Sequence, residues 1–226
     1  DALGLSDSTR VIYSSDHGEC LGARGLFGKF TMYDEAAAVP LIAAGPDVPE
    51  GHVVETPVSL VDVFPTAIEC LGADPAEAEL PGRSLWQIAN EGDTERTVLS
   101  EYHALGTEHA CFMLRRRCYK YIYYVGAPSQ LFDLREDPDE LNDLSTSSAH
   151  RTLVADFERE LRSMLDPEAI DARARADQRA MVERCGGEDA ERASGVSPAP
   201  LMRIRRAANP VCDSTQSAHS YPRSER

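Results

Sequence analysis

Apolar and polar positions in the first 95 residues follow the patterns of strands and helices in turn. The β-rich run Thr9–Ser15 stops abruptly at a polar stretch, and Val39–Ala44 is a second apolar run that predicts a buried strand. Between them lies a glycine-punctuated loop, and Thr31–Ala38 predicts a short helix or turn. Strands interleaved with helices are typical of an α/β domain, which we assign to residues 1–95. A strand so close to the first residue indicates that the chain begins in the middle of an α/β domain. We therefore expect the chain to be the C-terminal portion of a longer protein.

Apolar residues recur at helical spacing over Val58–Leu71, which predicts a helix. Ser59 is a candidate N-terminal cap, and Gly72 is a candidate end. We expect Pro65 to kink this helix or to restart it, because proline lacks the amide hydrogen and crowds the preceding turn. Asp74–Gly82 then predicts an acidic surface loop.

From residue 96 onward the pattern changes to short β-rich runs followed by helices. The runs that predict strands are Thr97–His103, Ala110–Arg115, Tyr119–Tyr124 and Gln130–Leu134. His150–Cys185 has apolar residues at helical spacing, and Pro167 predicts a break into two helices. Strands followed by helices indicate a small antiparallel α+β unit over residues 96–186. Residues 187–226 show little apolar periodicity and several Ser and Pro, so we predict a disordered tail.

Composition and charge exclude several functions. The chain has 23 basic and 38 acidic residues, a net charge of −15. Affinity for nucleic acid comes mainly from clustered Lys and Arg, so we expect no nucleic-acid partner. The longest apolar run, Ala36–Ala44, is broken by Pro40 and too short to cross a bilayer, so we expect no membrane partner. The six cysteines show neither a C-x-x-C pair nor the density of a small secreted domain, which favours reduced thiols and a cytoplasmic location.

The most informative stretch follows the first predicted strand. Asp16 and His17 stand at the carboxyl end of that strand, where ligands bind in α/β sheets, and their oxygen and nitrogen atoms suit a divalent cation. Gly18 lets the backbone turn directly after them. Lys29 can return its ammonium group across the glycine-rich loop to the same point, and a cation with a lysine neutralises an anionic ester oxygen. The alternative reading is an Asp-His turn with a surface hydrogen bond, and a solvated lysine.

Residues around this motif and further along the chain match a known pattern. They are Ser15–Glu19, Leu21–Gly22, Gly25–Lys29, Tyr33–Glu35, Val39–Ile42, Leu60–Thr66, Pro81–Leu85, Gln130–Leu134, Asp137–Pro138 and Glu140–Leu144. Over about residues 9–165 the chain resembles the sulfatase family of the alkaline phosphatase superfamily, most closely its choline-sulfatase and phosphonate monoesterase-like members. The resemblance implies the C-terminal part of an alkaline-phosphatase-like α/β sandwich, followed by the small α+β subdomain with its antiparallel sheet.

The resemblance also implies roles for individual residues. Asp16 and His17 would be two ligands of a divalent cation, usually Ca²⁺ with Mn²⁺ as an alternative, and Lys29 would bind the sulfate and polarise it. The nucleophile would be a formylglycine made from a Cys near the N-terminus, and two acidic metal ligands would come from the family's first strand. The modification motif Cys-x-Pro/Ala-x-Arg does not occur in this chain. Cys20 has an Arg at the right separation but Gly at the third position, so we expect a small packing residue there and no nucleophile in the chain.

Three further features are candidates for contact with a ligand. His103, at the end of a predicted strand, contacts substrate at the mouth of the site or is a hydrogen-bonded structural side chain. Arg24 is a further candidate for binding the anion, although the sequence does not show the path of the loop that carries it. Arg115–Arg117 with Lys120 resembles a nucleic-acid patch, but in so acidic a chain a hairpin with an exposed turn is the simpler interpretation.

Three functions stay open. The first is a sulfuric ester hydrolase acting on a small anionic ester, and the second is a phosphonate or phosphate ester hydrolase, because a cation and a lysine accept both anions. The third is a non-catalytic truncated remnant. Two ligands cannot complete the shell of about six to eight oxygens around Ca²⁺, and a covalent step needs a nucleophile, so we expect the chain alone to be inactive. Bare sheet surface would need the missing N-terminal half, or a second copy in a homo-oligomer, to cover it.

Overall fold

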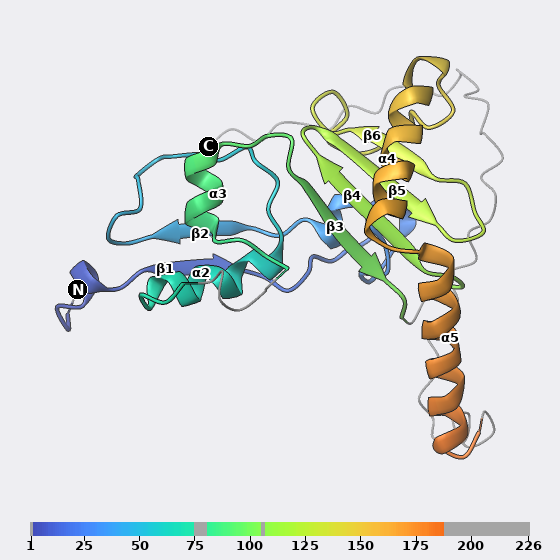
Figure 1. The fold of residues 1–226 in the computed structure, drawn as a ribbon, viewed down its shortest axis with the longest axis horizontal. Coiled ribbons are helices and arrows are strands. Elements are labelled where there is room, and N and C mark those ends of the chain that lie inside the picture. The colour runs from blue at the N-terminus through green and yellow to red at the C-terminus, as the bar shows by residue number, and fades with distance from the viewer. Residues whose placement is uncertain (1, 75–80, 105–106, 188–226) are drawn as a thin grey trace, which may run out of the picture.

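The computed structural model describes residues 2–74, 81–104 and 107–187. Its helices and strands form two groups (Figure 1). The first group contains β1 (Val11–Ser14), β2 (Leu41–Ala44), α2 (Val63–Cys70) and α3 (Leu85–Glu91). The second contains β3 (Thr97–Tyr102), β4 (Cys111–Arg116), β5 (Tyr119–Tyr124), β6 (Gln130–Asp133), α4 (Arg151–Met164) and α5 (Pro167–Arg184). The predicted tail and most of the predicted loop before Gly82 lie outside the described residues.

The first group is built around a two-stranded antiparallel sheet. Val11 of β1 pairs with Ala44 of β2, and Ser14 pairs with Leu41. Val39–Ala44 was predicted to be a buried strand, but in the structure its Ile42 is 60% exposed. The prediction of burial is wrong for the described chain, because none of its described segments covers that face of β2.

The predicted helix over Val58–Leu71 consists of two parts. A single 3-10 turn, Leu60–Asp62, comes first, and α2 begins at Val63. Ser59, the candidate cap, forms a reciprocal capping box with Asp62. Pro65 is the third residue of α2, where the amide hydrogen has no partner within the helix, so the proline allows a restart and produces no kink.

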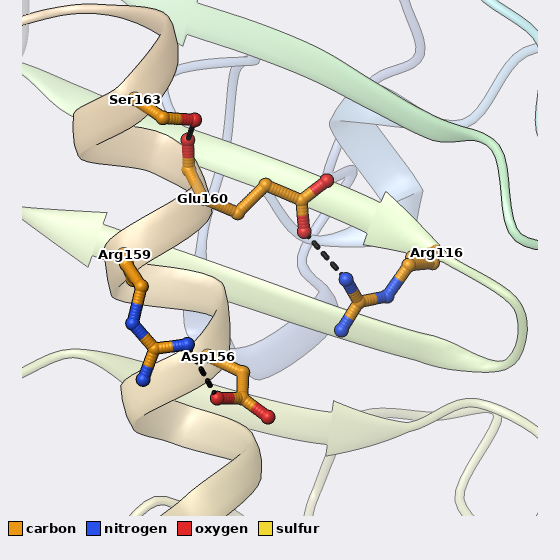
Figure 2. A pocket seen from close by; sticks show the side chains of 5 residues that line it. All are labelled: Arg116, Asp156, Arg159, Glu160 and Ser163. Carbon is orange, nitrogen blue, oxygen red and sulfur yellow. Dashed lines mark hydrogen bonds and ion pairs between the residues drawn. The ribbon is translucent and has the colours of Figure 1, made fainter.

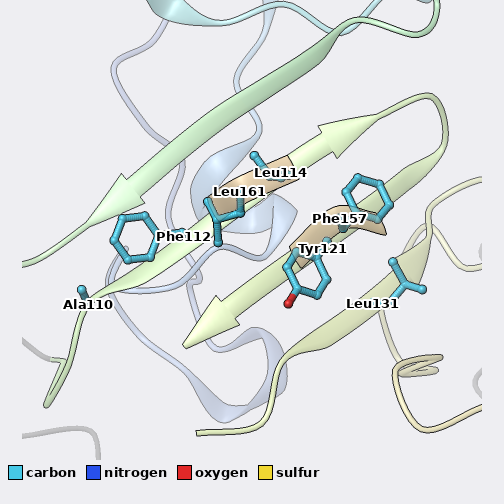
Figure 3. Close-up of a cluster of buried hydrophobic side chains, with 7 residues drawn as sticks. All are labelled: Ala110, Phe112, Leu114, Tyr121, Leu131, Phe157 and Leu161. Carbon is cyan, nitrogen blue, oxygen red and sulfur yellow. The ribbon is translucent and has the colours of Figure 1, made fainter. Parts of the chain in front are cut away.

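The second group is a four-stranded antiparallel sheet in the order β3-β4-β5-β6. Its hairpin turn lies between β4 and β5, as predicted, with Arg117 at a positive φ of 52°. One face of the sheet is covered by α4, and side chains from both form the main core (Figures 1 and 3). The members of this core are Ala110, Phe112, Leu114, Tyr121, Leu131, Phe157 and Leu161. Pro167 is the first residue of α5, so the predicted break between the two helices is confirmed.

The opposite face of this sheet is covered by a segment from early in the chain. Met32 belongs to a second buried cluster with Cys111, Met113, Ile122 and Phe132 of the sheet. Tyr33 and Ala37 pack against the same cluster, which places α1 (Asp34–Ala37) on the sheet. In Figure 1 this segment, in blue, runs behind the four strands. The segment that follows the predicted site therefore packs on the second sheet, against strands that come much later in the chain. None of the described helices is both long and apolar enough to cross a membrane.

Candidate functional site

Asp16, His17 and Lys29 come together directly after β1. The Nδ1 of His17 lies 2.8 Å from the carbonyl oxygen of Gly18. A carbonyl only accepts, so Nδ1 carries the hydrogen and Nε2 presents a lone pair. That Nε2 contacts Nζ of Lys29 and lies 3.2 Å from Oδ2 of Asp16. The structure therefore places a carboxylate, an imidazole and an ammonium group at one point.

The carboxylate of Asp16 faces solvent, with 84% of its side chain exposed. Its Oδ1 accepts a hydrogen bond of 3.0 Å from the amide of His17. Desolvation is the largest single influence and raises the pKa of Asp16, but the electrostatic attraction of His17 and the hydrogen bonds from His17 and Ser15 together outweigh it, so the pKa lies below its ordinary value. Asp16 is therefore an ionised group with an oxygen available to a ligand.

Gly18 fixes the position of this group against α1. Its amide donates to the carbonyl of Ala36 at 2.8 Å. A Cβ on Gly18 would lie 2.1 Å from the carbonyl oxygen of Glu35, so only glycine permits this approach. The residue that the sequence suggested for a sharp turn is thus also required for close backbone packing.

The loop between His17 and Lys29 is closed by its own backbone. The amide of Cys20 donates to the carbonyl of Gly28 at 2.9 Å, and the amide of Gly22 donates to Leu26 at 2.8 Å. Lys29 follows this closure directly and so returns to His17. The side chain of Cys20 is buried and its sulfur lies 3.9 Å from the hydroxyl of Thr31, as expected of a packing residue.

The donor atoms fit a divalent cation in kind but not in number. An ionised carboxylate and an imidazole nitrogen with a lone pair are ordinary ligands of such ions. No group of three or more His, Cys, Asp or Glu side chains suited to a metal occurs among the described residues. Asp16 and His17 could therefore supply part of a coordination shell, and the remaining ligands would have to come from elsewhere.

Arg24 does not reach the group formed by Asp16, His17 and Lys29. Its Nη1 donates to the carbonyl of Glu140 at 2.9 Å, and Nη2 lies 3.3 Å from Oε1 of Glu35. The guanidinium also lies 4.2 Å from the ring centroid of Tyr33. With these partners Arg24 attaches the loop to the second group and is not free to bind an anion.

Lys120 is a buried residue in what the sequence predicts as a hairpin with an exposed turn. Its side chain is 1% exposed, and Nζ lies 2.8 Å from Oε1 of Glu140 and 3.1 Å from the carbonyl of Met32. It also contacts Asp34 at the start of α1. Burial raises the pKa of Glu140, although the charge and hydrogen bond of Lys120 oppose that shift. The one available signal was the scarcity of lysine, since the chain has only Lys29 and Lys120.

His103 lies across the sheet from the candidate site. Tyr102, the residue before it, packs with Met32 on the face that carries the loop. The ring of His103 instead lies 5.4 Å from that of Phe112, a member of the core under α4, and its Nε2 is 3.3 Å from Glu101. Contact between His103 and substrate stays a prediction that this arrangement does not support.

A surface pocket between α4 and β4 is separate from these residues (Figure 2). Its lining residues are Arg116, Asp156, Arg159, Glu160 and Ser163. Arg116 pairs with Glu160 at 2.6 Å, and Arg159 pairs with Asp156 at 2.8 Å. Each charged side chain of this pocket thus has a partner within it, which leaves no charge for a ligand.

Comparisons with known proteins agree with the resemblance. The family model described as N-sulphoglucosamine sulphohydrolase, C-terminal, matches residues 22–166. Arylsulfatase K of dog is 36% identical over 182 residues, 75% of this chain and 34% of its own length. Human arylsulfatase K is 37% identical over 166 residues, 68% of this chain and 31% of its own length. The chain thus spans about a third of the length of the curated relatives that it matches.

Solved structures of similar fold point the same way. A 2-O GAG sulfatase has a TM-score of 0.61 and 26% identity, covering 77% of this chain and 38% of that one. Phosphonate monoester hydrolase of Agrobacterium radiobacter has a TM-score of 0.60 and 27% identity, covering 72% and 36%. Lys29 lies within the range of the family match, whereas Asp16 and His17 precede it. With its fold class confirmed by these structures, the chain belongs to the sulfatase family and matches that family's C-terminal region.

Proposed function

We propose that the protein containing this chain hydrolyses sulfate esters, and that the chain supplies part of the pocket that holds the anion. The observation that carries this proposal is the meeting of Asp16, His17 and Lys29 at the end of β1. None of these three residues belongs to either buried cluster. Because the chain belongs to the sulfatase family, we interpret their arrangement as part of a sulfate-binding site.

Lys29 is the group that would bind the ester. Its ammonium is exposed and stands beside the imidazole of His17, so it can approach a sulfate oxygen without disturbing a buried contact. Asp16 and His17 would hold a divalent cation, which we propose to be Ca²⁺ with Mn²⁺ as the alternative. Such a cation neutralises charge on the sulfate oxygens when it is bound.

The rest of the machinery would come from another part of the polypeptide. The family resemblance implies a formylglycine and two acidic ligands that this chain does not contain. Large apolar side chains are exposed over much of the first group, and they include Val11, Tyr13, Ile42, Phe64 and Leu71. Apolar surface of this extent marks an interface, so we infer that an N-terminal region, or a second copy of the chain, covers it.

Substitution of Lys29 tests the proposal in the full-length protein. Lys29→Ala should lower kcat/KM for an aryl sulfate by about 10²-fold or more, the usual effect of removing a group that stabilises developing charge. Arg117→Ala removes another exposed cation, from the β4–β5 turn, and serves as the control, with turnover unchanged. Equal turnover by the wild-type and Lys29→Ala proteins would remove the role given to Lys29.

Hydrolysis of phosphonate or phosphate esters is the second candidate function. It is favoured by the likeness to a phosphonate monoester hydrolase at 27% identity. A cation and a lysine bind both kinds of anion, so the site residues do not separate them. One enzyme preparation assayed on an aryl sulfate and on a phosphonate monoester gives the preference directly, and a larger kcat/KM for the phosphonate would replace the first proposal.

A non-catalytic role of the chain on its own is tested by titration with Ca²⁺. Two ligands should give only weak binding, in the millimolar range or above, because most of the shell would be water. Stoichiometric micromolar binding by the 226-residue chain would show that its own residues complete a site.

A further inference from the structure

We propose that Glu140 is a positioning residue for the sulfate-binding site. Together with Lys120 and Arg24, it holds the two segments that carry His17 and Lys29. Glu140 does not touch the site itself and lies beyond β6, in the second group. This inference rests on the proposed function, and the contacts of Glu140 are the evidence for it.

Glu140 is a carboxylate enclosed by hydrogen-bond donors. Its side chain is fully buried, and Oε2 accepts a hydrogen bond of 2.7 Å from the amide of Asp34. Oε1 lies 2.8 Å from Nζ of Lys120, which is equally buried. A buried ion pair contributes little net stability compared with well-packed apolar residues, so its presence suggests that it selects one geometry.

The first connection runs from Glu140 to His17 through α1. Asp34, held by Glu140 and Lys120, is the first residue of that helix. Near the other end of the helix, the carbonyl of Ala36 accepts the amide of Gly18 at 2.8 Å. The carbonyl of Gly18 in turn accepts from Nδ1 of His17 at 2.8 Å. A shift of α1 on the sheet would therefore turn the imidazole.

The second connection runs from Glu140 to Lys29 through the loop. Arg24 donates to the backbone carbonyl of Glu140 at 2.9 Å and lies 3.6 Å from its Oε2. Arg24 adopts a φ of 55°, a left-handed conformation that costs energy and that these contacts maintain. The loop around it is closed by the bond between the Cys20 amide and the Gly28 carbonyl, directly before Lys29.

Asp171 offers a matched carboxylate on the opposite face of the same sheet. It is buried, accepts the amide of Ala110 at 2.8 Å, and lies 3.7 Å from Arg175. Its partners lie just before β4 and in α5, away from the loop and α1. Loss of Asp171 should therefore disturb the fold as much as loss of Glu140, without moving the site.

Glu140→Gln is the variant of choice because it keeps the shape of the side chain. Its amide nitrogen is a donor and must face either the amide of Asp34 or the ammonium of Lys120, both of which are donors too. One contact is thereby lost with no change in volume. Asp171→Asn is the control, and Arg24→Lys is a milder second variant that keeps the charge but loses the two-pronged donor geometry.

Two readouts are measured in the full-length protein. The first is kcat for an aryl sulfate, which should fall about tenfold or more in Glu140→Gln, since small misplacements of catalytic groups are costly. The second is the rate at which an amine-reactive acetylating reagent modifies Lys29, followed by peptide mass spectrometry. His17→Ala gives the rate for a Lys29 that has lost its partner, and Glu140→Gln should approach that rate. Asp171→Asn should match the wild type in both readouts.

The proposal is overturned if Glu140→Gln keeps the wild-type kcat and labelling rate, or if Asp171→Asn shows the same losses. If Glu140→Gln does not fold, Arg24→Lys decides by the same two readouts, and wild-type values would count against positioning. If the wild-type protein hydrolyses no sulfate ester, the proposed function fails, and the labelling rate of Lys29 still decides whether Glu140 positions it.

Discussion

Replacement of Gly18 by alanine tests how closely α1 supports the site. The added Cβ would lie 2.1 Å from the carbonyl oxygen of Glu35 and 3.0 Å from its carbonyl carbon. Carbon and oxygen repel strongly below about 3 Å, so α1 would have to retreat by roughly 1 Å. The atoms it meets belong to backbone, so no side-chain rotation can relieve the contact.

The expected cost follows from two contributions. Forcing a methyl group into close-packed structure costs about 1–3 kcal/mol. The hydrogen bond between the amide of Gly18 and the carbonyl of Ala36, 2.8 Å in the native chain, would lengthen or break, at a net cost of about 1 kcal/mol. The Gly18→Ala chain should therefore unfold with a free energy about 2–4 kcal/mol lower than the wild type.

Gly82→Ala is the control, because its Cβ would meet a carbonyl just as closely. That Cβ would lie 2.2 Å from the carbonyl oxygen of Val61, beside α2 and away from the site. Thermal unfolding should show similar losses for both variants, about 2–4 °C for each kcal/mol in a chain of this size. Aryl sulfate turnover in the folded full-length protein should fall only for Gly18→Ala. A Gly18→Ala chain as stable as the wild type would refute the reasoning about this contact, and equal loss of turnover in both variants would refute the link to the site.

Three further outcomes are expected. Asp62 is buried and accepts hydrogen bonds from two backbone amides and, at 2.8 Å, from Arg96. Asp62→Asn should therefore lower the free energy of unfolding by about 3 kcal/mol in a urea titration. A change below about 0.5 kcal/mol would show that Arg96 needs no counter-charge there. Hydrogen bonds from Arg162 lower the pKa of Glu168 from 4.5 to about 2, so the contribution of Glu168 to the free energy of unfolding is present above pH 4.5 and is lost as the pH falls towards 2. In Glu168→Gln the free energy of unfolding should therefore depend less on pH over that range, and an unchanged pH dependence would contradict this reasoning. Cys20→Ala should leave turnover within about twofold of the wild type, because the thiol only packs; a loss near that of Lys29→Ala would make Cys20 a reacting group.

Local pattern was sufficient for most of the helices and strands. The four strands of the second group and the break at Pro167 follow from alternation and helical spacing, which depend on near neighbours in the chain. The polar stretch after β1 also identified Asp16, His17 and Lys29 as a group before any contact was known. The meeting of these three side chains in the structure agrees with that reading, because the closed loop between them is short.

Tertiary structure alone decided which faces and charges are buried. Lys120 is buried because Asp34, 86 residues earlier, and Glu140 both reach it, and no local pattern encodes a partner at that separation. The side of the sheet on which His103 lies depends on how β3 registers with β4, which its own sequence does not specify. Exposure of Ile42 depends on which segment covers β2. Sequence thus determined which segments form helices and strands and which residues are candidates for the site, since both depend on short stretches of chain. The attachment of the candidate site to Glu140 and the second sheet was decided by the tertiary fold, because it arises from contacts between segments about a hundred residues apart.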